Sequence, residues 1–527
     1  MLHYRSRLNF MLDDWAFVIY RAGGNPADYL NPHNEHIVVL PVAIYKLFLG
    51  IFGMTSPMPL QVFSVAAFLV SVVVLYLYLR PLVGEPVAVI GCGVILFLGT
   101  AWEDLLWTFQ IGFSISIACG IGALLMLRRE DRTGDRLACL FLCLAMISTS
   151  MGIPFAVGAF VQLALRRRAL LSRLYIVAVP LALYVAWWLG WGHTAENGAS
   201  IDNALGAPEY VFNAFRLALA NLTGAFRLSQ GPEELATSLL AIAALSAGGW
   251  FMYRRKRLSG AFLIAAAVGL AFWALAALNV GPGRDYTVSR YQFPAAVFTL
   301  MILAGAFEGV RPRLRFVGVL AAVALFAIFA NVLAMRDGFN SVFKPLSDKG
   351  IAGLTAVDLA SATIDPAQTI GMNADDRARV DVGSYFKAED RYGSVSWSDS
   401  EIEESSPAAR ARIDEVLVDL LPVSVQPARS MGPRQTCETV AATPDGDVVT
   451  PLPGPTFTFR ASDPVLLTMG RFGDVPQGAG LARPGDETLV TVPGDESDSP
   501  WRIGFLGDAS VRVCAGGTGF PPGDAEP

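Results

Sequence analysis

The sequence is poor in charge and in the residues that most soluble enzymes use for chemistry. Of its 527 residues, 16% are charged, four are histidine and six are cysteine. No Walker or dinucleotide-binding motif stands between a strand and a helix, and no CxxC pair indicates a metal site. The basic residues form short separate clusters and the large polar region is acidic, which argues against nucleic-acid binding.

Apolar side chains dominate instead, at 53% of the chain, with a mean hydropathy of +0.46. A bilayer core needs about 20 apolar residues per helix, so we expect a mainly α, polytopic transmembrane bundle of about ten spans. Two of the runs are short and predict a tight hairpin around 148–152. The apolar runs cover 60–80, 86–100, 105–127, 137–149, 151–165, 174–192, 234–253, 259–279, 292–310 and 316–334.

Charge is divided unevenly along the chain. Residues 335–527 hold 29 of the 46 acidic and 16 of the 40 basic residues, a net charge near −13, whereas residues 1–334 are near +7. This division predicts two bodies of different kinds.

Basic residues recur after every second apolar run, and such clusters mark cytoplasmic loops. Counting from them places 1–59, Trp102–Asp104, the 193–233 loop, 280–291 and everything after 335 outside. Within the 193–233 loop, apolar residues alternate with polar ones in a pattern that indicates an interfacial helix. This helix either lines a lipid groove or only anchors the loop. The basic clusters are Arg80; Arg128, Arg129, Arg132 and Arg136; Arg166–Arg168 with Arg173; Arg254–Arg257; and Arg311, Arg313 and Arg315.

One further run, Ile37–Gly53, does not fit this alternation as a span. We interpret it as an interfacial helix whose apolar face is broken by Lys46. The N-terminus then lies outside with no segment to carry it there, so we expect that the start is truncated and that a first span is missing; unaided translocation of a short tail is the alternative.

The predicted spans and the acidic region divide the whole chain into five parts. We expect an outer N-terminal loop with its interfacial helix at 1–59, the membrane domain at 60–334, a connecting subdomain at 335–430, a small β-sandwich at 431–520 and a disordered tail at 521–527. The β-sandwich either caps the membrane domain or binds glycan. Cys437 and Cys514 fall in it, and an outer compartment favours a disulfide between them over two free thiols.

Acidic, histidine and arginine residues gather in the predicted outer segments. Asp13 and Asp14 stand in an apolar stretch, where a carboxylate is costly without a purpose, so we regard them as candidates for a general base. The alternative is that they are solvated loop residues.

The second outer group contains His33, Glu35 and His36, and the third contains Glu103 and Asp104. If helical, His33 and His36 share a face. Hydrogen bonding to an acceptor is the favoured role of this set. A divalent cation (Mg or Mn) held by Glu103, Asp104, His33 and His36 is the alternative. It comes second because the two histidines alone do not make a closed metal site, which needs a third ligand in fixed geometry.

The last outer group contains Arg284, Arg290 and Tyr291. The arginines are either charges that reach toward lipid headgroups or ligands of a lipid phosphate, which a fixed guanidinium binds bidentately.

Taken in this order, Asp13-Asp14-Trp15, His33-Asn34-Glu35-His36, Glu103-Asp104 and Ser289-Arg290-Tyr291 give the chain a resemblance to the GT-C superfamily of membrane glycosyltransferases, here of the bacterial type. The resemblance covers residues 10 to about 334, and each motif is short. It implies a plasma-membrane enzyme with an extracytoplasmic C-terminal domain. It also implies a polyprenyl-phosphate sugar donor and a cell-envelope glycan or lipid acceptor.

The implied reaction is an inverting displacement at the anomeric carbon. Asp13 or Asp14 takes the acceptor proton, Arg290 with Arg284 and Tyr291 holds the donor phosphate, and the remaining outer residues orient the acceptor. The rival hypotheses are a transporter or flippase for a lipid-linked glycan, which charged residues buried within spans would favour, and a non-catalytic envelope-assembly protein.

Overall fold

The computed structural model describes residues 1–527 except 22, 167–169, 196–197, 229–233, 257, 373–378, 422, 429–435, 448–449 and 516–527. The predicted tail 521–527, together with Arg167, Arg168 and Arg257 of the basic clusters, lies outside the described residues. The chain divides into two compact units. The helical unit comprises Met1–Arg7, Tyr20–Ile51 and Pro57–Phe343, and the C-terminal unit comprises Leu8–Ile19, Phe52–Ser56 and Lys344–Pro527.

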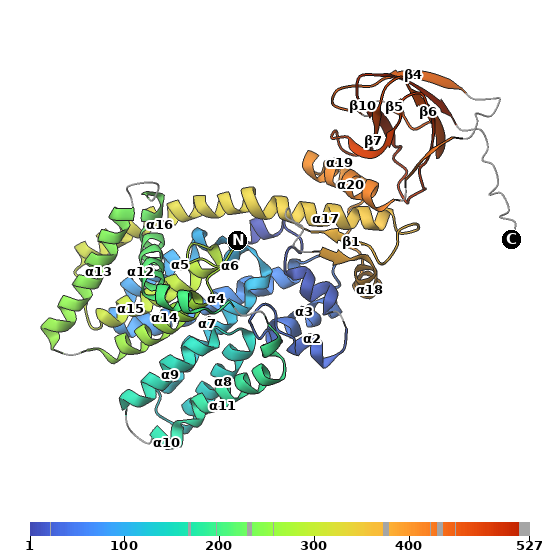
Figure 1. The fold of residues 1–527 in the computed structure, drawn as a ribbon. Coiled ribbons are helices and arrows are strands. Elements are labelled where there is room, and N and C mark those ends of the chain that lie inside the picture. The colour runs from blue at the N-terminus through green and yellow to red at the C-terminus, as the bar shows by residue number, and fades with distance from the viewer. Residues whose placement is uncertain are drawn as a thin grey trace. The chain divides into compact units, whose positions relative to one another are not determined.

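The helical unit consists of helices joined by short connections (Figure 1). Its α-helices are α1 (Leu2–Arg5), α2 (Pro26–Leu30), α3 (Val39–Phe52), α4 (Met58–Val83), α5 (Glu85–Leu96), α6 (Trp102–Leu106), α7 (Ile111–Leu127), α8 (Arg132–Ser148), α9 (Gly152–Arg166), α10 (Leu170–Arg173), α11 (Tyr175–Gly190), α12 (Ile201–Thr223), α13 (Glu234–Arg255), α14 (Gly260–Leu278), α15 (Gln292–Ala306) and α16 (Leu314–Gly338). Its shorter turns are η2 (Gly99–Ala101), η3 (Thr108–Gln110), η4 (Gly192–Thr194), η5 (Ala225–Leu228), η6 (Ser289–Tyr291) and η7 (Phe339–Phe343), and η1 (Ala16–Tyr20) lies across the boundary of the two units.

Every apolar run that the sequence singled out falls on a helix. Within the described part of the chain, five helical segments are long and apolar enough to cross a membrane, or six if the bent pair α5 and η2–α6 forms one broken span. The run 86–100 is therefore not one straight helix, because the chain bends by 40° between Leu96 and Gly99. The five segments are Met58–Val83, Thr108–Leu127, Leu235–Arg255, Gly260–Leu278 and Leu314–Leu359.

Close packing explains the bend in the 86–100 run. A Cβ at Gly99 would lie 1.6 Å from the carbonyl oxygen of Asn331 on α16. Only glycine permits this approach of two backbones. The carboxamide of Asn331 then binds the other side of the break, where its Oδ1 accepts a hydrogen bond from Thr100 N at 3.1 Å.

The two segments interpreted as interfacial also form helices. α3 is a 14-residue apolar helix, shorter than a span, and α12 runs for 23 residues through the 193–233 loop. Lys46 on α3 is paired, since its Nζ lies 3.0 Å from Asp28 Oδ2 and 4.3 Å from the centre of the Tyr29 ring. Lys46 thus joins α3 to α2.

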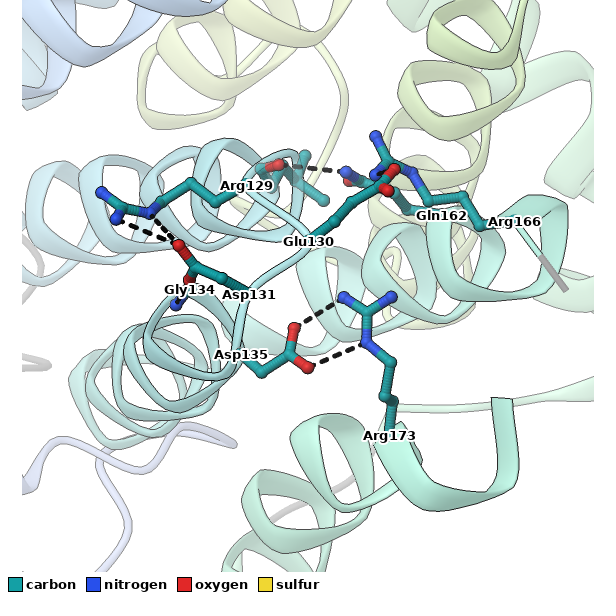
Figure 2. Close-up of polar contacts among 9 residues, drawn as sticks. Arg129, Glu130, Asp131, Gly134, Asp135, Gln162, Arg166 and Arg173 are labelled. Atoms are coloured by element: carbon teal, nitrogen blue, oxygen red, sulfur yellow. Dashed lines mark hydrogen bonds and ion pairs between the residues drawn. The ribbon is translucent and has the colours of Figure 1, made fainter. Parts of the chain in front are cut away.

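The predicted tight hairpin forms between α8 and α9, which three residues connect. At the opposite end of this hairpin, ion pairs tie the start of α8 and the end of α9 to their neighbours (Figure 2). Arg173 binds Asp135 with both ends of its guanidinium, at 2.9 Å and 2.6 Å, and Arg166 pairs with Glu130. Asp131 caps α8 by accepting from Gly134 N. These contacts hold together two loops that the sequence assigns to the same side.

In the C-terminal unit β1 and β2 lie between α17 and α18, and the remaining strands follow α20 (Figure 1). No residue outside helix separates α16 from η7 and α17, so the helix continues beyond the predicted end of the last span at residue 334. The π-helical turn η7 precedes Pro345, whose missing N–H is tolerated at a helix start. The helices are α17 (Lys344–Leu359), α18 (Val382–Tyr392), α19 (Asp399–Glu404) and α20 (Pro407–Leu420).

The strands of the C-terminal unit form antiparallel sheets. One sheet has the order β5-β10-β7-β8, a second β3-β9-β6-β11-β4, and β1 pairs with β2. The disulfide predicted from the sequence joins Cys437 and Cys514 across β4 and β11. The strands are β1 (Thr369–Gly371), β2 (Arg379–Asp381), β3 (Ser424–Pro427), β4 (Cys437–Ala441), β5 (Thr450–Pro451), β6 (Thr456–Ala461), β7 (Val465–Gly470), β8 (Gln477–Ala482), β9 (Glu487–Thr491), β10 (Arg502–Leu506) and β11 (Ser510–Ala515).

A buried polar cluster fastens α20 to the turn after β7. The Asp414 side chain is 0% exposed, and it accepts hydrogen bonds from the backbone N–H groups of Arg471, Phe472 and Gly473 at 2.8–3.1 Å. The Arg471 guanidinium in turn binds Asp495 at 2.7 Å and 2.9 Å and lies 4.4 Å from the Trp501 ring centre. Trp501 is therefore a core residue and not an exposed platform for a sugar.

We predict that Asp414→Ala destabilises the C-terminal unit by about 2–4 kcal/mol, because three buried N–H groups lose their acceptor. Thermal unfolding of the full chain measures the effect. Asp463→Asn, an exposed carboxylate of the same unit, is the matched control and should leave the transition unchanged. Equal melting temperatures for wild type and Asp414→Ala would contradict the role of this cluster.

Candidate functional site

The first part of the candidate site is a tight turn before α3. His33 N donates to His36 O at 3.1 Å and His36 N donates to His33 O at 3.0 Å, with Asn34 at a φ of 51°. The segment is thus not helical: Pro32 precedes it and Asn34 adopts the left-handed conformation that asparagine tolerates. The two histidines still lie opposite each other, as residues do in a hydrogen-bonded strand pair.

Arg21 fixes the chain that leads into this turn. Its guanidinium donates to the carbonyl oxygens of Asp28, Asn31 and Pro32, all at 3.0–3.1 Å, and the residue is 8% exposed. Sequence reasoning did not single out Arg21, although a basic residue just before a loop rich in Pro, Asn and Asp is a recognisable signal. Its contacts fix the residues that immediately precede the His33–His36 turn.

The second part joins α6 to η6. Arg290 N donates to Glu103 Oε2 at 2.7 Å, and the Arg290 guanidinium lies 3.8 Å from Glu103 Oε1. Ser289 Oγ donates to Thr100 O at 2.8 Å and accepts from Glu103 N at 3.1 Å. This exchange of hydrogen bonds fixes two segments that are 187 residues apart in the chain.

Ion pairing then connects the loop before η6 to the histidine turn. Arg284 pairs with Glu35, and both side chains are partly buried. Arg290 donates to the carbonyl oxygen of Gly283 in the same loop. The Arg290 charge is also close enough to His36 to influence its protonation. Three segments that the sequence placed on one side, the His33–His36 turn, α6 and the loop 280–291, therefore meet at one cluster.

Asp104 is the unusual member of this cluster. It is 2% exposed, and within the described part of the chain neither carboxylate oxygen has a hydrogen-bond partner. Glu103 and Arg290 are its charged neighbours. A buried carboxylate without partners is costly and is typical of functional sites.

Asp13 and Asp14 belong to the C-terminal unit. Asp14 is 2% exposed, and its Oδ2 accepts from Met11 N at 3.1 Å. Asp14 thus contributes to the local fold of its own segment. The role of Asp13 and Asp14 as the base stays a prediction.

Two cavities adjoin the cluster in the helical unit. The larger has a volume of about 750 Å³, and Glu103, Ser289, Gln292, Asn221 and Asp337 are among its lining residues. The smaller, of about 150 Å³, contains Glu35, His36, Arg284 and Tyr291 in its wall. The turn η6 contributes to both, through Ser289 on one side and Tyr291 on the other.

A hydrogen-bonded network of amides supports the larger cavity, and sequence reasoning missed it. Asn221 Nδ2 donates to Gln292 Oε1 at 2.8 Å, and Asn331 Nδ2 donates to Asn221 O at 2.9 Å. Asn331 stands in the apolar run 316–334, and an amide in such a run is the signal that would have identified it.

The metal alternative gains no geometric support. Among the residues that the structure describes, no group of three or more His, Cys, Asp or Glu side chains is placed to hold a metal ion. Arg284 and Arg290 are instead the partners of Glu35 and Glu103. A divalent cation thus remains a prediction from the sequence.

The His36 imidazole makes the cluster sensitive to acid. Burial, followed by the charges of His33 and Arg290, lowers the pKa of His36 to about 4. The unfolded chain, with the ordinary histidine pKa near 6.5, then binds the proton more readily than the folded chain. Folding stability is therefore lost as the pH falls from about 6.5 toward about 4.

We predict that the melting temperature of wild type falls more steeply over this pH window than that of His36→Gln, with a difference equivalent to about 1–3 kcal/mol. Thermal unfolding at several pH values measures it, and acidic groups common to both proteins cancel in the comparison. His193→Gln, at an exposed histidine, should behave as wild type. Parallel curves for wild type and His36→Gln would disprove the prediction.

Comparison with known proteins adds no relative: no protein-family model, no curated protein and no solved structure matches the chain.

Proposed function

We propose that this chain is a membrane glycosyltransferase that moves a sugar from a polyprenyl-phosphate donor to a glycan or lipid acceptor of the cell envelope. One observation carries the proposal. Acidic, histidine and arginine side chains from segments far apart in sequence, represented by Glu35, Glu103, Arg284 and Arg290, converge in one cluster beside two cavities. A protein that only anchors or caps has no use for such a group.

The proposed topology has about ten spans, with this cluster at the outer surface of the plasma membrane. The contacts between loops support it. Glu35–Arg284 and Glu103–Arg290 join loops assigned to the outside, whereas Asp135–Arg173 and the bond from Arg311 to Leu82 O join loops assigned to the inside. The shorter helices α8, α9, α11 and α15 complete the span count.

We also propose that the two larger sheets of the C-terminal unit pack as a β-sandwich. Phe459 of β6 and Phe505 of β10 come from different sheets, and their ring centres are 5.0 Å apart. Side chains that meet between two sheets in this way form the core of a sandwich.

In the proposed reaction the acceptor hydroxyl oxygen forms a bond to the anomeric carbon while the bond from that carbon to the phosphate oxygen breaks. Asp13 or Asp14 removes the hydroxyl proton, and the polyprenyl phosphate leaves with the bonding electron pair. Arg290, with Arg284 and Tyr291 nearby, stabilises the charge that develops on the phosphate. Attack opposite the leaving group inverts the anomeric centre.

We predict that membranes containing the full chain transfer radiolabelled sugar from a polyprenyl-phosphate donor. Asp13→Asn or Asp14→Asn should lower the rate roughly 10²–10³-fold, and so should Arg290→Ala as a separate variant. Arg290→Lys should recover only part of the activity, because lysine lacks the bidentate geometry. Arg313→Ala, at an exposed arginine, is the matched control.

Unchanged transfer in both aspartate variants would reject the base assignment. No transfer with any donor would reject the enzyme and leave glycan transport or envelope assembly as the explanation. Equal amounts of each variant in the membrane are the condition for either conclusion.

We further predict the orientation of the helical unit. In a background with Cys92, Cys119, Cys139 and Cys143 replaced by alanine, a membrane-impermeant maleimide should label Thr287→Cys in intact cells. It should label Leu258→Cys only after permeabilisation. Both positions are exposed, so the difference reports sidedness, and the reverse pattern would contradict both the topology and the glycosyltransferase proposal.

A further inference from the structure

The smaller cavity has polar atoms with no partner inside the protein. Among the described residues, His36 Nδ1 and Asn279 Oδ1 are enclosed and accept or donate no hydrogen bond. The amide orientation of Asn279 is set, since its Nδ2 donates to Leu275 O at 3.2 Å. Both residues line the same cavity. Enclosed polar atoms of this kind require a ligand or water to satisfy them.

The walls of this cavity carry no net charge. Among the described residues that line it, Arg284 is the one cation and Glu35 the one anion, and the two are paired. His36 is neutral at physiological pH, because burial lowers its pKa to about 4. A free anion or cation entering the cavity would have no uncompensated charge to meet. A neutral ligand is therefore favoured.

Aromatic rings form the other walls. Phe113 and Phe272 are buried, and Tyr184 and Tyr291 are partly exposed; all four line the cavity. Aromatic faces combined with a few neutral hydrogen-bonding groups match a sugar ring, which presents C–H groups on its faces and hydroxyl groups on its rim.

The size of the cavity limits the ligand. Its volume of about 150 Å³ equals the space of about five waters, at roughly 30 Å³ each. This is on the order of one sugar ring. The cavity that Glu103 and Ser289 line is larger, with a volume of about 750 Å³.

We propose that the cavity lined by Glu35, His36, Ser150, Asn279, Arg284 and Tyr291 binds one neutral sugar ring. His36 Nδ1 and Asn279 Oδ1 contact its hydroxyl groups, and the Glu35–Arg284 pair closes one wall. That this ring is the sugar of the substrate rests on the proposed function, whereas the binding of a ring does not.

The test is direct binding to the full chain in detergent or nanodiscs. The probes are the methyl glycosides of glucose, mannose, galactose and N-acetylglucosamine at millimolar concentration, with inorganic phosphate as the charged probe. Melting temperature reports binding. We expect at least one glycoside to raise it in a saturable manner and phosphate to leave it unchanged.

Two variants locate the site. Asn279→Leu removes the acceptor and fills space, and it should weaken binding about tenfold or more; His36→Phe should do the same if Asn279→Leu fails to fold. Asn340→Leu, at an exposed position outside the cavity, should bind as wild type. No response to any glycoside, a response to phosphate instead, or binding unchanged in both cavity variants would overturn the proposal.

The transfer assay separates this inference from the proposed function. Glycoside binding that is lost in Asn279→Leu, without sugar transfer by wild type, would support the cavity and reject the enzyme. Sugar transfer by wild type that is unchanged in Asn279→Leu and His36→Phe would support the enzyme and reject the cavity as a sugar site.

Discussion

The cost of an unpaired charge in apolar surroundings is the constraint on which the rest of this structure depends. A chain that is 53% hydrophobic and 16% charged has few ionic groups and few places where water can solvate them. Such groups are stable only when another charge or a backbone group meets them. In the helical unit that requirement is satisfied where helices end, by Glu35 with Arg284, Glu103 with Arg290, and Asp135 with Arg173.

The same constraint separates structural charges from candidate functional ones. Asp135 and Arg173 form a bidentate ion pair, in which both carboxylate oxygens accept a hydrogen bond from the guanidinium. Few of their polar atoms therefore remain for binding a ligand. In the cluster around Arg290 the pairing is less complete: the distance from its guanidinium to Glu103 is 3.8 Å, and Asp104 is enclosed without a partner among the described residues. Enclosed charges with incomplete pairing are typical of functional sites, so this cluster is the candidate site.

The C-terminal unit meets the constraint with backbone donors. Asp414 collects three N–H groups of one turn, and Asp495 binds Arg471 beside the ring of Trp501. These contacts and the disulfide between Cys437 and Cys514 fix the long turns between short strands. Trp501 is 5% exposed and belongs to this core, so its ring is not available to stack on a sugar.

The sequence by itself determined where the helices and several strands lie, because an apolar run or an alternating stretch specifies its own local structure. It also identified the disulfide and the residues of the Arg290 cluster, since charges in a mostly apolar chain are conspicuous. It did not predict that the His33–His36 segment forms a tight turn or that the 86–100 run is bent. Both depend on a single backbone conformation, at Asn34 and at the close approach of Gly99 to α16.

Only the tertiary structure decided which charges meet and which polar atoms are left without partners. Glu103 and Arg290 are 187 residues apart, and no local pattern encodes such a pairing. The cavity with His36 and Asn279 arises where the ends of several helices come together, so each residue alone is an ordinary loop or helix-end residue. Local sequence sets the elements through their own hydrophobic pattern, whereas the site results from packing between elements that no single segment specifies.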